Sequence, residues 1–277
     1  MDTILALKAL IMGIVEGLTE FLPISSTGHL ILANSLLQFT GPSFSKEKAD
    51  VFEIVIQAGA ILAVCWEYRV RIATVLSGMF TDRKAQRLVI NLIIAFLPAA
   101  ILGFLFSRRI KEVLFNPVSV AIAFIVGGLI ILAVESRKQR QPRIHHIDEL
   151  TALDALKVGL CQCFGMIPGT SRSGSTIIGG LLVGLSRPVA TEFSFFLAIP
   201  TMIGATTLEF AKHHHDIMAG AHGVGFGAIA VGLVVSFVVA LVVVRAFVHY
   251  ISRHGFAPFA WYRIVAGAVA LIWLLQR

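Results

Sequence analysis

Long apolar runs alternate with short polar and basic loops along the chain. Six of these runs are about 20 residues long and carry few charges, which is the length that an α-helix needs to cross the hydrocarbon core of a bilayer. They cover residues 51–68, 88–107, 118–135, 191–211, 225–248 and 258–275. The pattern therefore predicts an all-α integral membrane protein with six transmembrane helices.

Two further apolar segments, 5–38 and 153–186, are interrupted in the middle by Pro, Gly, Ser and Thr. Each is too long for a single span, yet neither contains a polar loop that would divide it into two. This pattern is typical of a re-entrant helical hairpin, in which a half-helix enters the membrane, turns and leaves by the same face. The irregular turn is tolerated where protein or water covers it.

The two broken segments match each other. The string "GIVEGLTEFLPISSTGH" begins at Gly13 and "GLCQCFGMIPGTSRSGS" begins at Gly159, 146 residues later, and the spans that follow match at a spacing of 141. The chain therefore predicts two repeats, 1–145 and 146–277, in one membrane domain, each with a broken hairpin and three spans. Because three is odd, we expect the second repeat to be inverted, and binding sites in such folds lie where the broken segments meet.

Composition agrees with a membrane protein. Of the 277 residues 57% are hydrophobic and 14% are charged, and the mean hydropathy is +0.85, whereas a soluble domain has about 25% charged residues. The bases that give the net charge of +7 lie mostly in short loops, where Lys and Arg set the topology and contact anionic lipid. We therefore expect contacts with membrane lipid and none with nucleic acid.

Basic residues are unevenly distributed among these loops. Loops 69–87 and 136–157 carry five Lys or Arg residues each, 108–117 carries three and 212–224 carries one. Because loops rich in Lys and Arg stay in the cytoplasm, the first two are predicted inside, and the other two, together with loop 39–50, are predicted outside. The first broken hairpin then enters from the outer face.

Glu16 and Glu20 lie in the first broken segment, four residues apart, and share one face of a helix. Two adjacent carboxylates in a membrane protein repel each other and are costly to desolvate. A proton, an arginine or a metal ion must compensate them, unless the helix starts in the solvated interface. The matching positions of the second repeat are Gln162 and Met166, so the repeat itself does not require acids.

Each broken segment also carries a turn rich in hydroxyl groups. Pro23 ends the first helix, and a new helix is predicted to start near His29. Free N–H groups at a helix start, surrounded by hydroxyls, make an anion site, although Ser, Thr and Gly also promote close helix packing. The candidate phosphate-binding residues of the two turns are Ser25, Thr27, Gly28, Thr170, Ser171, Ser173, Gly174 and Thr176.

Arg172 lies in the second of these apolar hairpins. Helix packing does not explain an arginine there, and an intramembrane arginine is by default a functional-site hypothesis. A guanidinium binds phosphate in bidentate fashion. The sequence therefore predicts a phosphate ligand, attached to a lipid because the site lies in a membrane.

The strings "EGLTEFLPISSTGHL" and "PGTSRSGST", with "FEIVIQAGAILAV" and "EFSFFLAIP", give the chain a strong resemblance over its whole length to the bacterial undecaprenyl-diphosphate phosphatases, the bacitracin-resistance proteins. The resemblance implies hydrolysis of undecaprenyl diphosphate to undecaprenyl phosphate and inorganic phosphate. This activity recycles the lipid carrier for peptidoglycan and other wall polymers and confers bacitracin resistance. It also implies the bacterial inner membrane and a divalent cation. The loop charges predict that the site opens to the periplasm, where the resemblance implies that undecaprenyl diphosphate is released; a homodimer is an open alternative to a monomer.

The resemblance assigns roles to five candidate catalytic residues, namely Ser26, His29, Glu20, Glu16 and Arg172. In the mechanism we favour, Ser26 attacks the terminal phosphorus and His29 or a carboxylate removes the serine proton. The alternatives are attack by His29 or by water. Mg²⁺ or Ca²⁺ bound by Glu16 and Glu20 would neutralise the acids and the diphosphate together, because hard oxygen ligands suit either ion.

Two other functions are compatible with parts of the pattern. The type-2 phosphatidic acid phosphatases share a string like "STGH", but they need a histidine six residues after the arginine, where this chain has Ile178. A polyprenyl-phosphate flippase would use the same inverted repeat and phosphate cradle. The acids and His29 favour an enzyme, because a carrier needs no general acid and base.

The remaining polar residues receive ordinary interpretations. The three cysteines, Cys65, Cys161 and Cys163, are expected to be buried thiols. The run His213–His215 is expected to lie in a solvated loop, with metal binding as the less favoured alternative. Arg263 in the last span is expected to reach the membrane interface, with an approach to the site as the less favoured alternative.

Overall fold

The computed structural model describes residues 3–40, 46–136, 141–224 and 226–276, and this part of the chain is helical, with no β-strand. The α-helices are α1 (Thr3–Thr19), α2 (Ser26–Leu37), α3 (Lys46–Glu67), α4 (Arg69–Gly78), α5 (Arg83–Leu114), α6 (Pro117–Ser136), α7 (Ala152–Gln162), α8 (Arg172–Val183), α9 (Arg187–Val224), α10 (Phe226–Ile251) and α11 (Ala257–Leu275). The short 3₁₀ helices η1 (Ile147–Glu149) and η2 (Cys163–Met166) flank α7.

Six of the described helices are long and apolar enough to cross a membrane: α3, α5, α6, α9, α10 and α11. Each overlaps one of the predicted spans, so the prediction of an all-α membrane protein with six spans is confirmed. The prolines inside α5 and α9, Pro98 and Pro200, do not interrupt these helices, as is common in membrane helices, where neighbouring groups satisfy the freed carbonyl.

The predicted loops were wrong in two places. α9 continues to Val224, so the segment 212–224 is helical; no proline follows Pro200 before Pro258, and nothing in the chain stops the helix at the predicted membrane edge. The run His213–His215 lies in this stretch, and its side chains are not among those that the structure describes. The segment 69–87 contains the additional helix α4.

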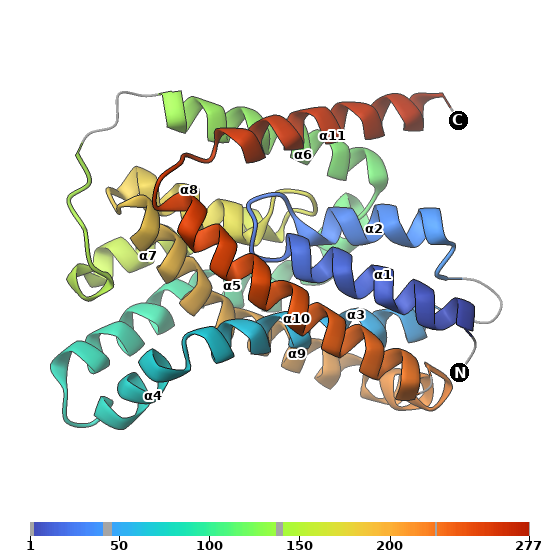
Figure 1. The fold of residues 1–277 in the computed structure, drawn as a ribbon, viewed down its shortest axis with the longest axis horizontal. Helices are drawn as coiled ribbons and strands as arrows, with labels where there is room; N and C mark the ends of the chain where they lie inside the picture. The colour runs from blue at the N-terminus through green and yellow to red at the C-terminus, as the bar shows by residue number, and fades with distance from the viewer. Residues whose placement is uncertain (1–2, 41–45, 137–140, 225, 277) are drawn as a thin grey trace.

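The two broken segments meet in the middle of the molecule (Figure 1). The turn between α1 and α2 lies beside the turn that precedes α8, and a hydrogen bond from Ser173 Oγ to the Leu22 carbonyl joins them at 2.8 Å. Around them, α10 packs against α1 and α3, and α11 packs along α6. Both broken segments therefore form helical hairpins. That they re-enter one face, and that the repeats are inverted, stays a prediction.

Small residues allow α1 to approach α10 closely. A Cβ added at Gly17 would lie 2.7 Å from the Ser236 carbonyl, and one at Gly13 would lie 2.9 Å from the Gly232 carbonyl. Close backbone contact through small residues is the usual way in which membrane helices associate. The contact fixes α1, which carries Glu16 near its end.

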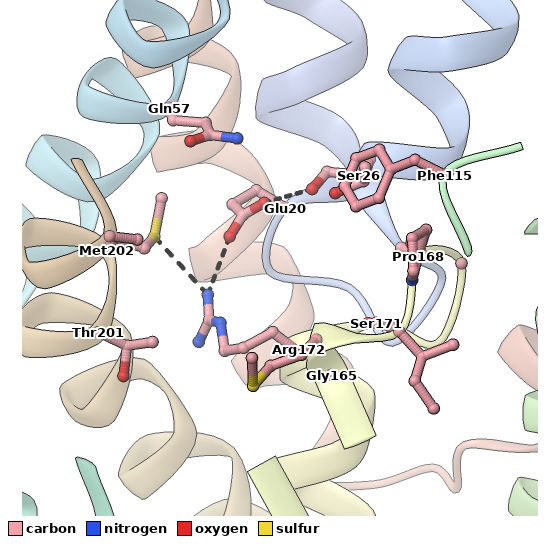
Figure 2. A pocket seen from close by; sticks show the side chains of 16 residues that line it. Glu20, Ser26, Gln57, Phe115, Gly165, Pro168, Ser171, Arg172, Thr201 and Met202 are labelled. Carbon is pink, nitrogen blue, oxygen red and sulfur yellow. Dashed lines mark hydrogen bonds and ion pairs between the residues drawn. The ribbon is translucent and has the colours of Figure 1, made fainter. Parts of the chain in front are cut away.

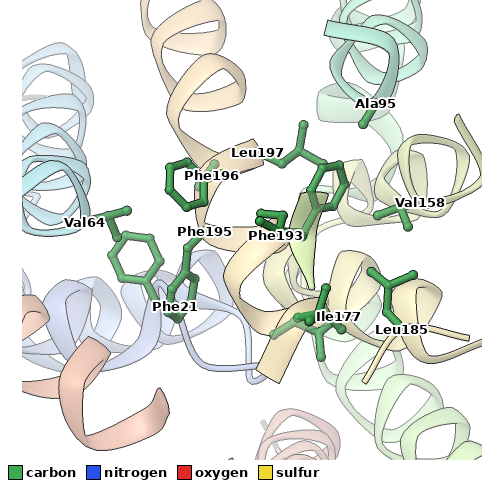
Figure 3. Packing of buried hydrophobic residues seen from close by; sticks show 14 of the residues in the cluster. Phe21, Val64, Ala95, Val158, Ile177, Leu185, Phe193, Phe195, Phe196 and Leu197 are labelled. Carbon is green, nitrogen blue, oxygen red and sulfur yellow. The ribbon is translucent and has the colours of Figure 1, made fainter. Parts of the chain in front are cut away.

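An aromatic cluster supports the end of α1. Phe21 is fully buried, and its ring packs edge-on against Phe195 of α9, with the ring centroids 5.3 Å apart and the planes at 77° (Figure 3). Such aromatic pairs contribute about 0.5–1.5 kcal/mol beyond the area they bury. Because Phe21 directly follows Glu20, this packing fixes the backbone that presents the carboxylate.

Candidate functional site

The first broken turn ends α1 at Thr19 and begins α2 at Ser26, three residues before the predicted start. The amide of Glu20 still donates to the Glu16 carbonyl at 3.0 Å, so both acids lie on the helical end of α1. Ser25, which precedes α2, has a φ of 72°. This left-handed conformation is rare for a residue with a Cβ and costs about 1–3 kcal/mol.

The second broken turn has the same construction. Gly169 has a φ of 88°, Ser171 has a φ of 75°, and α8 begins directly afterwards at Arg172. Ser25 and Ser171 are 146 residues apart, which is the spacing of the matched glycines. Two equivalent serines are thus strained at the two helix starts that face each other.

Hydroxyl groups of the second turn bind the backbone of the first. Ser173 Oγ donates to the carbonyl of Leu22 at 2.8 Å, and Ser171 Oγ donates to the same carbonyl at 3.4 Å. Ser171 Oγ also accepts the amide of Gly174 at 3.0 Å and so caps α8. These contacts join the two turns into one unit.

A polar cavity of about 200 Å³ lies between the joined turns and the spans (Figure 2). Its lining includes the predicted residues Glu20, Ser25, Ser26, Thr27, Ser171 and Arg172, together with Gln57, Phe115, Gly165, Met166, Ile167, Pro168, Gly169, Thr201, Met202 and Ala205. The structure thus brings together six of the predicted site residues from two segments that are about 146 positions apart.

Glu20 is the central group of this cavity. Its Oε2 accepts a hydrogen bond from Ser26 Oγ, and its Oε1 forms an ion pair with Arg172 Nη2 at 3.0 Å. Arg172 also donates to the carbonyl of Ser194 at 3.1 Å. Little of either side chain is exposed: 10% of Glu20 and 15% of Arg172. The arrangement places a carboxyl group beside a hydroxyl and a guanidinium, in a largely buried site.

Glu16 lies behind Glu20 and is fully buried. Neither of its carboxylate oxygens has a hydrogen-bond partner among the described residues, and Glu16 does not line the polar cavity. A buried carboxylate without a partner needs a proton or a cation. The described residues contain no group of three or more His, Cys, Asp or Glu side chains suited to a metal ion. Glu16 has this need but no access to the cavity, whereas Glu20 lines the cavity and is engaged by Ser26 and Arg172.

His29 lies apart from the cavity. Its Nδ1 is 2.7 Å from the Ser25 carbonyl and its Nε2 is 2.7 Å from the Tyr262 hydroxyl. The two rings are stacked, with the centroids 5.6 Å apart and the planes at 10°. A neutral imidazole that donates from Nδ1 and accepts at Nε2 satisfies both contacts. His29 thus links α2 to α11, and Tyr262 is a partner that the sequence did not indicate.

Other predicted phosphate-binding residues have contacts within the protein. Thr176 Oγ1 is 2.6 Å from Ser194 Oγ, and a Cβ added at Gly28 would lie 2.6 Å from Phe124 Cζ. Thr170 and Gly174 line a second, apolar cavity. Some hydroxyl residues and glycines of the turns therefore line the polar cavity, and the others pack against neighbouring parts of the protein.

The favoured prediction for Arg263 was wrong, and the structure agrees with the alternative that it approaches the site. Instead of reaching the membrane interface, its side chain is 1% exposed and binds backbone carbonyls of both turns. The same rule that marked Arg172, an arginine within an apolar span, marks Arg263 as well. The cysteines are free thiols, as expected, but each is half-buried rather than fully buried.

Comparison with known proteins adds an independent finding. Residues 9–269 match the model of the family described as bacitracin resistance protein BacA. The chain is 59% identical to a protein named undecaprenyl-diphosphatase from Herminiimonas arsenicoxydans, with 98% of this chain and 96% of the relative covered. It is 58% identical to undecaprenyl-diphosphatase 2 from Rhodospirillum rubrum, with the same coverage.

Proposed function

The chain belongs to the bacitracin resistance protein BacA family, and from this membership we propose that it hydrolyses undecaprenyl diphosphate to undecaprenyl phosphate and inorganic phosphate. Relatives with 53–59% identity carry the name of this activity. The observation that carries the proposal for this chain is the contact of Glu20 with both Ser26 and Arg172 in a polar cavity between two helix starts. The product serves as the lipid carrier for wall polymers, and its recycling underlies bacitracin resistance.

Ser26 is the nucleophile in the mechanism that this geometry supports best. Its Oγ attacks the terminal phosphorus, the bond from that phosphorus to the bridging oxygen breaks, and undecaprenyl phosphate leaves. Glu20 takes the serine proton, because Ser26 Oγ already donates to its carboxylate. Water then attacks the phosphoserine, releases inorganic phosphate and restores the hydroxyl.

The phosphoryl oxygens are held by Arg172 and by the two helix starts. The N-termini of α2 and α8 flank the turns that line the cavity, and such termini favour anions because their N–H groups are free and their dipoles are positive. Arg172 adds a guanidinium that binds phosphate in bidentate fashion. Preorganised donors of this kind stabilise the charge that develops in the transition state.

Glu20 is preferred to His29 as the base because His29 is engaged by Ser25 and Tyr262 and does not line the cavity. The two routes through other nucleophiles remain distinct chemically: attack by water forms no phosphoenzyme, and attack by His29 forms an acid-labile phosphohistidine. Trapping and mapping the phosphoenzyme distinguishes them. A phosphate on His29 would contradict the serine mechanism.

We propose that Glu16 and Glu20 hold Mg²⁺ or Ca²⁺. The unpartnered oxygens of Glu16 fit a hard cation, and the ion would supply charge neutralisation to the diphosphate. Glu16→Gln should then weaken the binding of Mn²⁺, used as a paramagnetic probe in detergent, while Glu112→Gln on the exposed end of α5 should leave it unchanged. Phosphate release that survives thorough chelation in the unaltered protein would contradict the metal proposal.

The apolar part of the substrate has space beside the polar cavity. A cavity of about 570 Å³ between α6 and α8 and another of about 380 Å³ beside α5 are lined mainly by apolar residues. Both share Ile167 with the polar cavity. We place the polyprenyl chain of the substrate in these apolar surroundings, next to the phosphate site. Their nearness supports a lipid-linked diphosphate over a water-soluble one.

The cavity lies near the end of the spans that the loop charges predict outside. Phe115, in the short connection between α5 and α6, lines it, and this connection is part of the predicted outer loop 108–117. We therefore propose an enzyme of the bacterial inner membrane with a site that opens to the periplasm.

Phosphate release from undecaprenyl diphosphate by the purified protein in detergent tests the proposed function. Ser26→Ala and Glu20→Gln should abolish most of the release, whereas Ser77→Ala, an exposed serine of α4, should not change it. A detergent solution has no sides, so a flippase without hydrolytic activity would release no phosphate. Absence of release from folded unaltered protein would favour that alternative.

A further inference from the structure

Arg263 lies within α11, and its side chain is 1% exposed. We propose that it is a positioning residue for the hydrolysis proposed above: its guanidinium holds the two turns in the geometry that binds the transferring phosphoryl group. This inference rests on the proposed function. It concerns a residue outside the two broken segments and outside the polar cavity.

The guanidinium binds backbone carbonyls with every donor it has. Nη1 donates to Pro23 and Thr170 at 3.0 and 2.7 Å, Nη2 donates to Ala123 and Gly169 at 2.9 and 2.8 Å, and Nε donates to Phe124 at 3.3 Å. An arginine side chain has five N–H groups, and five carbonyls use them all. No donor remains for a phosphate, so Arg263 acts through the backbone that it holds.

The bound carbonyls belong to the strained parts of both turns. Pro23 lies two residues before Ser25, and Thr170 lies directly before Ser171, the two serines with positive φ. Strained conformations persist only where the surrounding structure fixes them from several sides. Arg263 fixes both turns at once from behind, and through Ala123 and Phe124 it fastens them to α6.

The geometry of the peptide bond links the contact of Arg263 to the orientation of an N–H group at the cavity. In a planar trans peptide the C=O and the following N–H point in opposite directions. Because the Thr170 carbonyl points to Arg263, the N–H of Ser171 points away from it, and Ser171 lines the polar cavity next to Arg172. A shift of the turn would therefore move an N–H group and the catalytic guanidinium together.

A lysine cannot replace Arg263. An ammonium has three donors, so at least two of the five buried carbonyls would lose their partner, and buried unpaired carbonyls are costly. The positive charge matters less than the shape of the donor set, since no carboxylate of the described residues is hydrogen bonded to Arg263. Only the planar guanidinium, with donors on three nitrogens, can contact both turns and α6 at the same time.

Two variants test the inference in different ways. Arg263→Lys keeps the charge and removes the fork. Gly127→Ala keeps the arginine but displaces it, because a Cβ at Gly127 would overlap the guanidinium and would lie 2.6 Å from Cζ. The three atoms nearest to this Cβ all belong to Arg263. Gly103→Ala is the matched control, since its Cβ would meet only Met166 Cε, at an ordinary 3.7 Å.

The measurement compares kcat, KM and the inhibition constant of orthovanadate, which mimics the transferring phosphoryl group, for the full-length protein in detergent. Both variants should lower kcat by about 10²-fold, the usual effect of a misplaced reacting group. They should raise the inhibition constant of vanadate by on the order of tenfold, because the turns bind the transferring phosphoryl group. A change in KM would report on the lipid chain instead, since Gly127 and Arg263 also line the apolar cavity proposed for it. Gly103→Ala should match the unaltered protein in all three.

The vanadate constant separates positioning from stability. Only folded molecules contribute to it, so a variant that merely folds less well keeps the constant of the unaltered protein. If Gly127→Ala and any folded Arg263→Lys keep that constant, the inference about Arg263 is overturned and the proposed function stands. If the unaltered protein releases no phosphate and binds no vanadate, both proposals are overturned.

Discussion

Glu20 is engaged by the two groups that the proposed chemistry needs, the Ser26 hydroxyl and the Arg172 guanidinium. The Ser26 hydroxyl already donates to this carboxylate, so the acceptor for the serine proton is in place before substrate binds. The phosphate of a substrate would compete with Glu20 for Arg172. Substrate binding and activation of Ser26 are thereby coupled through a single carboxylate.

Arg172→Ala should reduce the rate of phosphate release by on the order of 10² to 10³, which corresponds to a loss of about 2.7–4 kcal/mol of transition-state stabilisation from one preorganised donor. Arg172→Lys should restore little of it, because an ammonium lacks the planar fork. The measurement is kcat/KM in detergent. Arg108→Ala is the control, since Arg108 forms an exposed ion pair on α5 and its side chain is 91% exposed; full activity in folded Arg172→Ala protein would exclude Arg172 from the reaction.

The sequence predicted Glu20 and Arg172 as site residues because ionisable groups in apolar segments are rare and usually functional, and the family resemblance added Ser26. The same rule marks Arg263, but the sequence could not predict the positioning role that we propose for it. The partners of Arg263 are backbone carbonyls, which every residue has, so no pattern of side chains marks them. His29 was predicted as a catalytic residue because its type suits a general base. In the structure its ring contacts the Tyr262 hydroxyl and does not line the polar cavity, and its catalytic role stays a prediction.

The two broken turns are the elements that build the site. Each stops a helix near a proline, passes through a serine with positive φ and starts a new helix at once. Pro23 and Pro168 made the breaks predictable. The start of α2 at Ser26 was not predictable, because it depends on a left-handed serine, and residues with a Cβ seldom adopt that conformation.

Ser25 allows the cost of this backbone to be measured. Its side chain makes no capping hydrogen bond to α2, so Ser25→Gly and Ser25→Ala both remove the hydroxyl, and only the glycine accepts a φ of 72° without strain. Ser25→Gly should therefore be more stable than Ser25→Ala by about 1 kcal/mol. Thermal unfolding in detergent measures the difference, and equal midpoints would show that the turn carries no strain at this residue.

At the scale of the whole molecule, six spans were predictable because a span needs only length and apolarity. The extents of α5 and α9 beyond the membrane were not, since helix propensity and tertiary contacts decide where a helix ends outside lipid. The charge of the loops predicts the orientation of the molecule in the membrane. The structure contributes one helix on which that orientation can be tested without ambiguity.

α5 runs from Arg83 to Leu114, and Lys84 and Glu112 are exposed residues at its two ends. At 1.5 Å per residue they are separated by about 42 Å, more than the roughly 30 Å of the hydrocarbon core, so they lie on opposite sides of the membrane. In a background without Cys65, Cys161 and Cys163, an impermeant thiol reagent added to intact cells should label Glu112→Cys and spare Lys84→Cys. Permeabilised cells should show labelling of both. Because Phe115 lines the polar cavity close to the Glu112 end, the reverse pattern in intact cells would place the phosphate site on the cytoplasmic face.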